Sequence, residues 1–325
     1  IKNNTFENIS DRIMRFNLVA PGTSITITGN NATNSGDRAG EVIKATTLGS
    51  GITYDIHDNN WGEGKTVAND EFKDAGEQAP IADSEQLKKA LAGATAGTPV
   101  ELTLAAGEFS TNGLSLAGKT VTIKGEGQDK TILNAGTTYP ESNGANVVFD
   151  NLTIIGTDGN YTGFQHSGNV TFKNVHFKGV LYTYSSGVDT FENCTFEPTV
   201  VGTSVYPVVC YGGLNTVFKN CEFKNGQGKG ILVYNEGDGA DRNYNITISE
   251  CTFTATGPND KGAIEIHTER WPKNTTGTIT INNTTCDKNF GGGLWREWYN
   301  IDTKHTTDYF RVVVDGKTQQ KGSRQ

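Results

Sequence analysis

The chain has 325 residues, of which 40 are glycine, and its charged and hydrophobic fractions are 20% and 34%. Its formal net charge is −8 without a Lys/Arg cluster; this argues against a nucleic-acid partner, because a phosphate backbone requires a positive surface. No apolar run approaches the roughly 18 residues that a membrane span requires, and recurrent β-branched and aromatic residues argue against disorder. The composition therefore favours a fold of strands and turns with a thin core.

The first part of the chain repeats the sequence pattern of a later segment. Residues 1–18 run parallel in sequence to residues 218–235, and residues 25–28 match residues 246–249. We therefore interpret residues 1–66 as the last three coils of a preceding β-helix copy. A polar linker is expected over residues 67–80, and a second copy over residues 81–325.

The second copy is expected to open with a short amphipathic helix over residues 83–92. Asp83 with Gln86 three residues later has the form of a capping box. The open end of a solenoid exposes apolar surface and strand edges, so we expect this helix to cap it.

A six-residue phrase then recurs, in which an Asn often precedes a small residue. Its copies begin at Phe149, Phe172, Phe191, Phe218, Ile248 and Ile281, which are 19 to 33 residues apart. Such variable spacing is typical of β-helix coils, whose turns differ in length while the strands stack about 4.8 Å apart. We expect the Asn residues at a corner in left-handed geometry, where their side chains form ladders. The next position, with Cys194, Cys221 and Cys251, is expected to form a column of small buried hydrophobes.

A second strand follows each phrase. Alternation places six residues inside and the residues between them outside; the inward set is Val208, Cys210, Ile231, Val233, Ile264 and Ile266. At the end of the chain, residues 310–318 carry the Asp-Gly signal of a hairpin.

Residues 102–109, 121–127 and 130–133 resemble the opening coils of the pectin-lyase-like right-handed parallel β-helix superfamily. This superfamily includes polysaccharide lyases, pectin methylesterases and non-catalytic bacterial surface repeats. The resemblance covers residues 81–300 and again 1–66. Together with the repeats, it predicts an all-β, right-handed parallel β-helix with an N-terminal capping helix in the second copy. One fold carries unrelated functions, so the resemblance does not assign an activity.

A local likeness to pectin methylesterases lies at residues 207–212 followed by residues 218–221. Val208 stands where that family has its nucleophilic Asp, and the family's Gln-Asp pair is replaced by Gly179 and Val180. Residues 294–298 match its Leu-Gly-Arg-Pro-Trp motif in only three of five positions. These departures disfavour esterase chemistry.

The leading hypothesis is a non-catalytic, extracellular tandem-repeat module, such as an adhesin, surface-layer or fibre segment. Aromatic residues on successive second strands predict a surface on which sugar rings stack. The expected glycan-binding residues are Tyr182, Tyr184, Tyr211, Tyr234, Trp295, Arg296 and Trp298. The expected partners are a polysaccharide or cell-surface glycan and, head to tail, further copies of the chain, which would build a filament. No metal or cofactor is expected.

The alternative is a polysaccharide lyase or glycoside hydrolase that acts on an acidic polysaccharide. Its candidate catalytic residues are Glu265, His267 and Arg270, and a lyase of this fold is expected to use Ca²⁺. Glu265 and His267 are expected to project outward from one strand. A phage tail-fibre segment is a further alternative, because tail fibres share this architecture.

Overall fold

The computed structural model describes most of the chain in two compact units, Ile1–Ala79 and Pro80–Gln325. The described residues are 1–16, 19–35, 42–45, 52–63, 65, 80–136, 142–156, 162–166, 168–199, 206–211, 215–226, 229–234, 243–267, 276–298 and 310–319. No helix in these ranges is long and apolar enough to cross a membrane.

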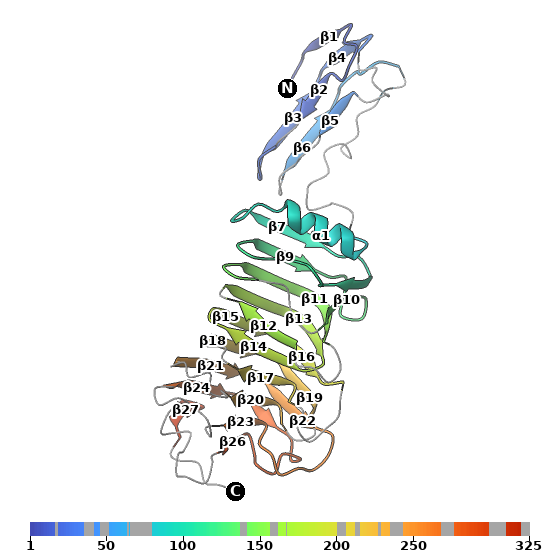
Figure 1. The fold of residues 1–325 in the computed structure, drawn as a ribbon. Coiled ribbons are helices and arrows are strands. Elements are labelled where there is room, and N and C mark those ends of the chain that lie inside the picture. Colours follow the sequence, from blue (N-terminus) through green and yellow to red (C-terminus); the bar gives the residue numbers. More distant parts are fainter. Residues whose placement is uncertain are drawn as a thin grey trace. The chain divides into compact units, whose positions relative to one another are not determined.

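The first unit is built from three pairs of parallel strands (Figure 1). β1 (Thr5–Glu7) pairs with β4 (Asn31–Thr33), β2 (Met14–Phe16) with β5 (Ile43–Ala45), and β3 (Ser24–Thr28) with β6 (Thr53–His57). Their inward side chains form one core with Met14, Ile25, Ile27, Ala32, Val42, Ile43, Ile52 and Trp61. The coils are thus stacked, and their assignment to a preceding copy stays a prediction.

The second unit stacks its strands as rungs of two sheets (Figure 1). The larger sheet contains β7 (Pro99–Thr103), β8 (Gly107–Ser110), β9 (Thr120–Lys124), β10 (Thr131–Gly136), β11 (Asn146–Gly156), β13 (Asn169–Lys178), β15 (Val188–Glu192), β16 (Thr195–Glu197), β18 (Asn215–Lys219), β19 (Glu222–Gly226), β21 (Asn243–Ser249), β22 (Thr252–Ala255), β24 (Thr276–Asn282), β25 (Thr285–Cys286), β27 (Phe310–Val314) and β28 (Lys317–Thr318). The smaller sheet contains β12 (Thr162–His166), β14 (Leu181–Ser185), β17 (Val208–Tyr211), β20 (Ile231–Tyr234), β23 (Ile264–His267) and β26 (Trp295–Trp298). Successive coils pair in parallel, as predicted.

The unit closes with the predicted hairpin, in which β27 and β28 pair antiparallel. Asp315 and Gly316 form its turn with φ of 47° and 77°. Positive φ at both central residues is the geometry that Asp-Gly favours in a two-residue hairpin loop.

The predicted helix is α1 (Ser84–Gly93). Asp83 is its N-cap, and Gln86 N donates to Asp83 Oδ1 at 2.8 Å, which satisfies one of the free amides of the first turn. Leu87 and Leu91 are buried in the core of the unit. That the helix caps the solenoid stays a prediction.

The predicted Asn corners are confirmed. Left-handed φ values of 46° to 57° recur at the third position of the phrase, in Asn151, Asn174, Asn193, Asn220, Glu250 and Asn283. The side chains also form the expected ladder, because Asn220 Nδ2 donates to Asn193 Oδ1 at 2.8 Å and Asn193 Nδ2 to Asn174 Oδ1 at 3.3 Å. Asn tolerates this geometry better than most residues, which explains its repetition.

Inside the solenoid, phenylalanine rings stack from coil to coil. Centroid separations run from 4.4 to 5.3 Å, close to the strand spacing, in two columns, Phe149–Phe172–Phe191–Phe218 and Phe177–Phe196–Phe223–Phe253. The first and last positions of the phrase therefore build the core, as predicted.

The position after the corner is buried, as predicted, but it is more than a small hydrophobe. The Cys221 thiol donates to its own coil at Lys219 O and to the preceding coil at Phe191 O, both at 3.4 Å. In the first unit, Asn59 Nδ2 likewise donates within its own coil to His57 O, at 2.9 Å, and across coils to Ile27 O, at 2.7 Å. Cys194 and Thr284 repeat the pattern. The column thus adds side-chain donors to carbonyl groups at the corner, some of which also accept a backbone bond, as Lys219 O does from Asn193 N at 3.0 Å.

In the second strands the predicted inward residues are confirmed, but three of the predicted outward residues are not solvent-facing. All six predicted inward residues are fully buried, from Val208 to Ile266. The prediction that the residues between them are solvent-facing was wrong for Val209, Leu232 and Glu265, whose exposed fractions are 1%, 6% and 0%. Val209 and Leu232 belong to a second apolar cluster outside the main core, and Glu265 is enclosed by cationic side chains.

Candidate functional site

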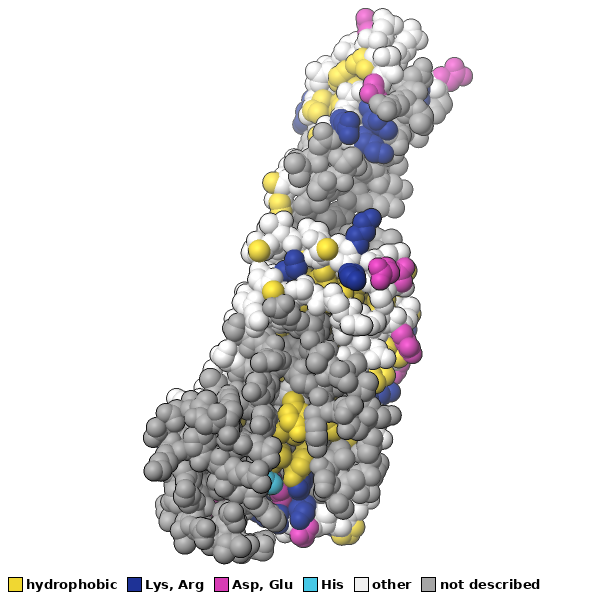
Figure 2. Space-filling model, in the orientation of Figure 1, with side chains coloured by type: hydrophobic (Ala, Val, Ile, Leu, Met, Phe, Trp, Pro, Cys, Tyr) yellow, Lys and Arg dark blue, Asp and Glu magenta, His cyan; other side chains and the backbone are white. Residues whose placement is uncertain are grey.

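One column of side chains crosses the outer face of the smaller sheet. Successive strands place Tyr182, Val209, Leu232, Glu265 and Arg296 opposite one another, from β14 to β26. The column is apolar in its first three rungs and ionic in its last two. Figure 2 shows a stripe of hydrophobic side chains that leads to Lys/Arg, Asp/Glu and His side chains in the lower half of the view.

The apolar part of the column is a small cluster of its own. Val209 and Leu232 pack with Tyr206, and the partly buried Val180 and Tyr182 flank them. Because Val209 and Leu232 are covered, they cannot serve as a flat stacking surface for sugars. Tyr206 is the aromatic residue of this cluster that contacts the ionic part of the column, through Lys229.

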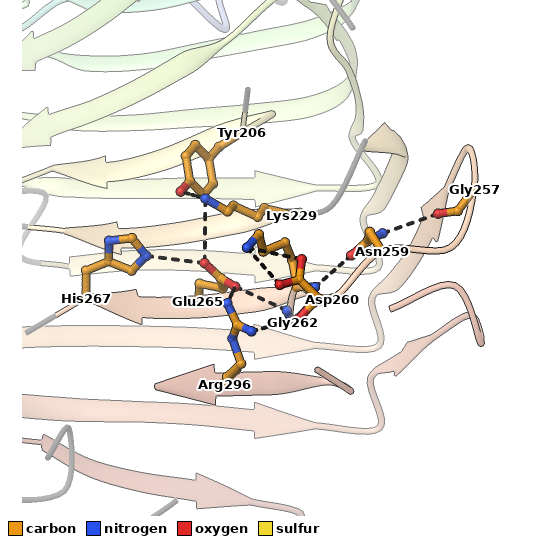
Figure 3. A network of polar contacts seen from close by, with 10 residues as sticks. Tyr206, Lys229, Gly257, Asn259, Asp260, Gly262, Glu265, His267 and Arg296 are labelled. Carbon is orange, nitrogen blue, oxygen red and sulfur yellow. Dashed lines mark hydrogen bonds and ion pairs between the residues drawn. The ribbon is translucent and has the colours of Figure 1, made fainter. Parts of the chain in front are cut away.

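Glu265 lies at the centre of the ionic part (Figure 3). Its Oε1 lies 2.6 Å from Arg296 Nη2 and accepts from Gly262 N at 3.3 Å. Its Oε2 lies 3.2 Å from His267 Nε2 and 3.7 Å from Lys229 Nζ. Both carboxylate oxygens are therefore occupied by basic or donor groups from three neighbouring rungs.

Lys229 precedes β20 and Tyr206 precedes β17 by the same offset, so the two residues stack at one corner of the solenoid. Lys229 Nζ donates to Tyr206 Oη and lies 3.9 Å from the centroid of the Tyr206 ring. An ammonium group near an aromatic ring is attracted by its quadrupole. The Tyr206 ring thus holds the Lys229 head above Glu265.

The charges shift two pKa values. Burial opposes ionisation of Glu265, but the hydrogen bond with His267 and the charges of Lys229 and Arg296 outweigh it, and the pKa of Glu265 is lowered. Burial also lowers the pKa of Lys229, and Glu265 only partly offsets this effect. The site therefore holds a carboxylate that stays ionised and an amine that loses its proton more readily than a surface lysine.

A short segment before β23 shapes the edge of the site. Arg296 Nη1 donates to Asp260 O at 2.7 Å, and Lys261 N donates to Asn259 Oδ1 at 2.9 Å. A Cβ atom at Gly262 would lie 2.9 Å from Arg296 Cβ. Glycine at this position therefore allows Arg296 to lie close against the preceding coil.

The structure brings together three of the predicted residues, namely Glu265, His267 and Arg296. Tyr182 lies at the far end of the same column, whereas Trp295 pairs with the inward Ile264 and packs against the main core. Arg270 and the side chains of Tyr184, Tyr211, Tyr234 and Trp298 lie outside the described residues.

Sequence reasoning missed Lys229 and Tyr206. A signal was present, because both residues stand two positions before a second strand, as Gly262 does before β23. Within the described residues, no group of three or more His, Cys, Asp or Glu side chains is arranged to hold a metal ion. The Ca²⁺ expected for a lyase stays a prediction.

Comparisons with known proteins address the fold. The family model described as "Right handed beta helix region" matches residues 141–302. A solved structure of a mutant of AlyGC, an alginate lyase of the PL6 family, is similar with a TM-score of 0.39 and 16% identity over 90% of this chain. This chain spans 47% of the length of that chain. No curated protein matches the sequence. The chain folds as a right-handed parallel β-helix, as predicted.

Proposed function

We propose that the chain is an extracellular repeat module that binds a polysaccharide or cell-surface glycan without cleaving it, as an adhesin, surface-layer or fibre segment. The observation that carries this proposal is the ring of Lys229, His267 and Arg296 around Glu265 on the outer face of the smaller sheet. These three side chains are 10% to 12% exposed, whereas the side chain of Glu265 is fully buried. The side chains of this site that retain some solvent exposure are thus the basic ones.

The charge balance of the ring favours an acidic glycan. Lys229 and Arg296 contribute two positive charges and Glu265 one negative charge, so one positive charge remains before His267 is counted. In a partly desolvated site this charge attracts an anion more strongly than a surface lysine does. The ring of Tyr206 lies beside Lys229, and the partly buried Tyr182, three strands away in the same column, adds apolar surface for a sugar.

The state of Glu265 argues against a glycoside hydrolase. Such enzymes need two carboxyl groups flanking the scissile bond, and one of them is protonated. Glu265 has a lowered pKa and no solvent exposure, so it neither donates a proton at neutral pH nor reaches a substrate. The neighbouring Asp260 lies at the surface, where its carboxylate pairs with Lys261.

Polysaccharide lyase activity is the second candidate, and one observation favours it. The lowered pKa of Lys229 raises the fraction of neutral amine, the form that can abstract a proton from a sugar ring. Arg296, which pairs with the same carboxylate, supplies a positive charge for a bound acidic sugar. In this reading Lys229 is the base of an elimination.

Both candidates are tested with the full chain. Binding to polygalacturonate, alginate and hyaluronan is measured by calorimetry, with uncharged dextran as reference. Lys229→Ala and Arg296→Ala are each expected to weaken binding about tenfold or more, the effect of losing one charged hydrogen bond. Lys224→Ala is the matched control, because Lys224 pairs with Glu222 on the other sheet and is expected to leave binding unchanged.

The ultraviolet absorbance of unsaturated sugar products, with and without Ca²⁺, separates the two candidates. Binding without product supports the module. Product that disappears in Lys229→Ala establishes a lyase and overturns the leading proposal. No binding to any acidic glycan contradicts both.

A further inference from the structure

Glu265 differs from Lys229, His267 and Arg296 because its side chain has no solvent exposure. We infer that Glu265 is a positioning residue: it holds Lys229 and Arg296 in the geometry that binds one acidic group of the glycan, without touching that group itself. This inference rests on the proposed function and specifies what the ring recognises.

The first support is the depth of each group. The Glu265 side chain is 0% exposed, while those of Lys229, Arg296 and His267 are 11%, 10% and 12% exposed. Figure 3 shows the basic groups converging on the carboxylate from different sides. Solvent therefore reaches parts of the three basic side chains and no part of the Glu265 side chain.

The second support is that the two carboxylate oxygens of Glu265 contact different partners. Oε1 faces Arg296 and the Gly262 amide, and Oε2 faces Lys229 and His267. The carboxylate thus links a residue before β20, its own strand β23 and the following strand β26. Long side chains such as Lys and Arg lose considerable conformational freedom on binding, and a shared anion that fixes both in advance reduces that cost.

The third support is the charge that remains. Glu265 cancels one of the two fixed cations, so the ring has capacity for a single anionic group such as a carboxylate or sulfate. The preceding rungs of the column offer Leu232 and Val209, which are buried and apolar. A second anionic group at their level would have no partner in the column and would be costly to desolvate.

The decisive experiment is Glu265→Gln. Attraction by net charge and positioning by Glu265 predict opposite changes in affinity for the glycan. The substitution retains the shape and removes one negative charge, so that the net charge of the site rises by one. If the ring attracts glycans by net charge alone, the variant binds the tightest acidic polysaccharide of the calorimetric series more strongly. If Glu265 positions the ring, the variant binds about tenfold more weakly despite the added charge.

Asp260→Asn is the matched control. It also replaces one carboxylate by an amide near Arg296, but its side chain is 79% exposed and pairs with Lys261. It is expected to bind as well as the unmodified chain or slightly better. If Glu265→Gln and Asp260→Asn both tighten binding, the inference is wrong while the proposed glycan-binding function stands.

A second variant decides the case in which Glu265→Gln does not fold. Arg296→Lys retains the charge but removes the planar group that reaches both Glu265 and Asp260 O. Positioning predicts a loss of about tenfold at constant charge, and unchanged binding would overturn it. If the unmodified chain binds no acidic glycan at all, the proposed function fails, which is a different result from either variant outcome.

Discussion

Glu265 and Arg296 are direct neighbours across β23 and β26, and Arg296 Nη2 lies 2.6 Å from Glu265 Oε1. In the two preceding rungs the same column holds Leu232 and Val209. The column therefore changes from an apolar contact to an ion pair within one strand spacing. This change places a buried carboxylate at a position that holds an apolar side chain in the two preceding rungs. The contribution of Glu265 to stability can therefore be measured by substitution.

Glu265→Ala is expected to destabilise the second unit by about 3–5 kcal/mol, because removal of one partner leaves Lys229 and Arg296 partly buried without their counter-ion. Urea unfolding followed by circular dichroism measures the change. The matched control is Glu222→Ala, which removes the carboxylate of the more exposed Lys224–Glu222 pair and should cost under about 1 kcal/mol. Equal costs for the two variants would show that Glu265 does not hold the rung together.

The lowered pKa of Glu265 predicts the pH dependence of stability. In the unfolded chain the pKa of a Glu is about 4.3, and in the folded chain the pKa of Glu265 is below that value. The folded state therefore binds fewer protons in this window, and stability increases with pH. The contribution is fully present above the unfolded pKa and is lost as the pH falls through the folded pKa.

Unfolding midpoints between pH 3 and pH 6 measure this effect. The unmodified chain should lose stability toward acid more steeply than Glu265→Gln, which lacks the titrating group. Parallel curves for the two proteins would be inconsistent with an ion-paired Glu265.

Cys221 should be replaceable by a residue whose side chain donates a hydrogen bond, but not by an apolar residue of similar size. Cys221→Ser retains a group that can donate to Lys219 O and Phe191 O, whereas Cys221→Val leaves these carbonyls without their side-chain partner. We expect Val to cost about 1–3 kcal/mol and Ser to cost less, as measured by thermal unfolding. If Val is tolerated better than Ser, the position acts through apolar burial alone.

Glu250 occupies a corner at which five other coils have Asn, and its φ is 57°. In this geometry Cβ lies too close to a carbonyl oxygen, and Asn is better tolerated than Glu because its short polar side chain can hydrogen-bond locally. Glu250→Asn should therefore stabilise the unit by up to about 1 kcal/mol. Asn220→Ala is the reciprocal substitution at φ 51°, and it should be destabilising. A result of the same sign for both variants would contradict the conformational explanation.

Local repetition made the fold predictable. The phrase beginning at Phe218 contains its own corner residue, Asn220, and its own core residue, Phe223, so short stretches of sequence carry the geometry of each coil. The hairpin turn was predictable for the same reason, because the adjacent residues Asp315 and Gly316 determine it. Parallel pairing then follows from the repetition, because similar phrases stack in register.

The site was less predictable because it is assembled across coils. Lys229 and Glu265 are 36 positions apart, and their contact depends on the lengths of two turns. Alternation placed Glu265 on the outer face but could not indicate that residues of the neighbouring coils cover it. Tyr206 and Lys229 precede their strands, and only the register of β17 with β20 reveals that they stack.

The donor at each corner also limits where the chain can change in length. Cys221 and Asn59 each tie the corner of one coil to the coil before it, so an inserted residue there would break bonds in two coils at once. The phrases nevertheless begin 19 to 33 residues apart. Insertions and deletions must therefore accumulate between the corners. The molecule can in this way acquire new outward loops without altering the register on which its stacking depends.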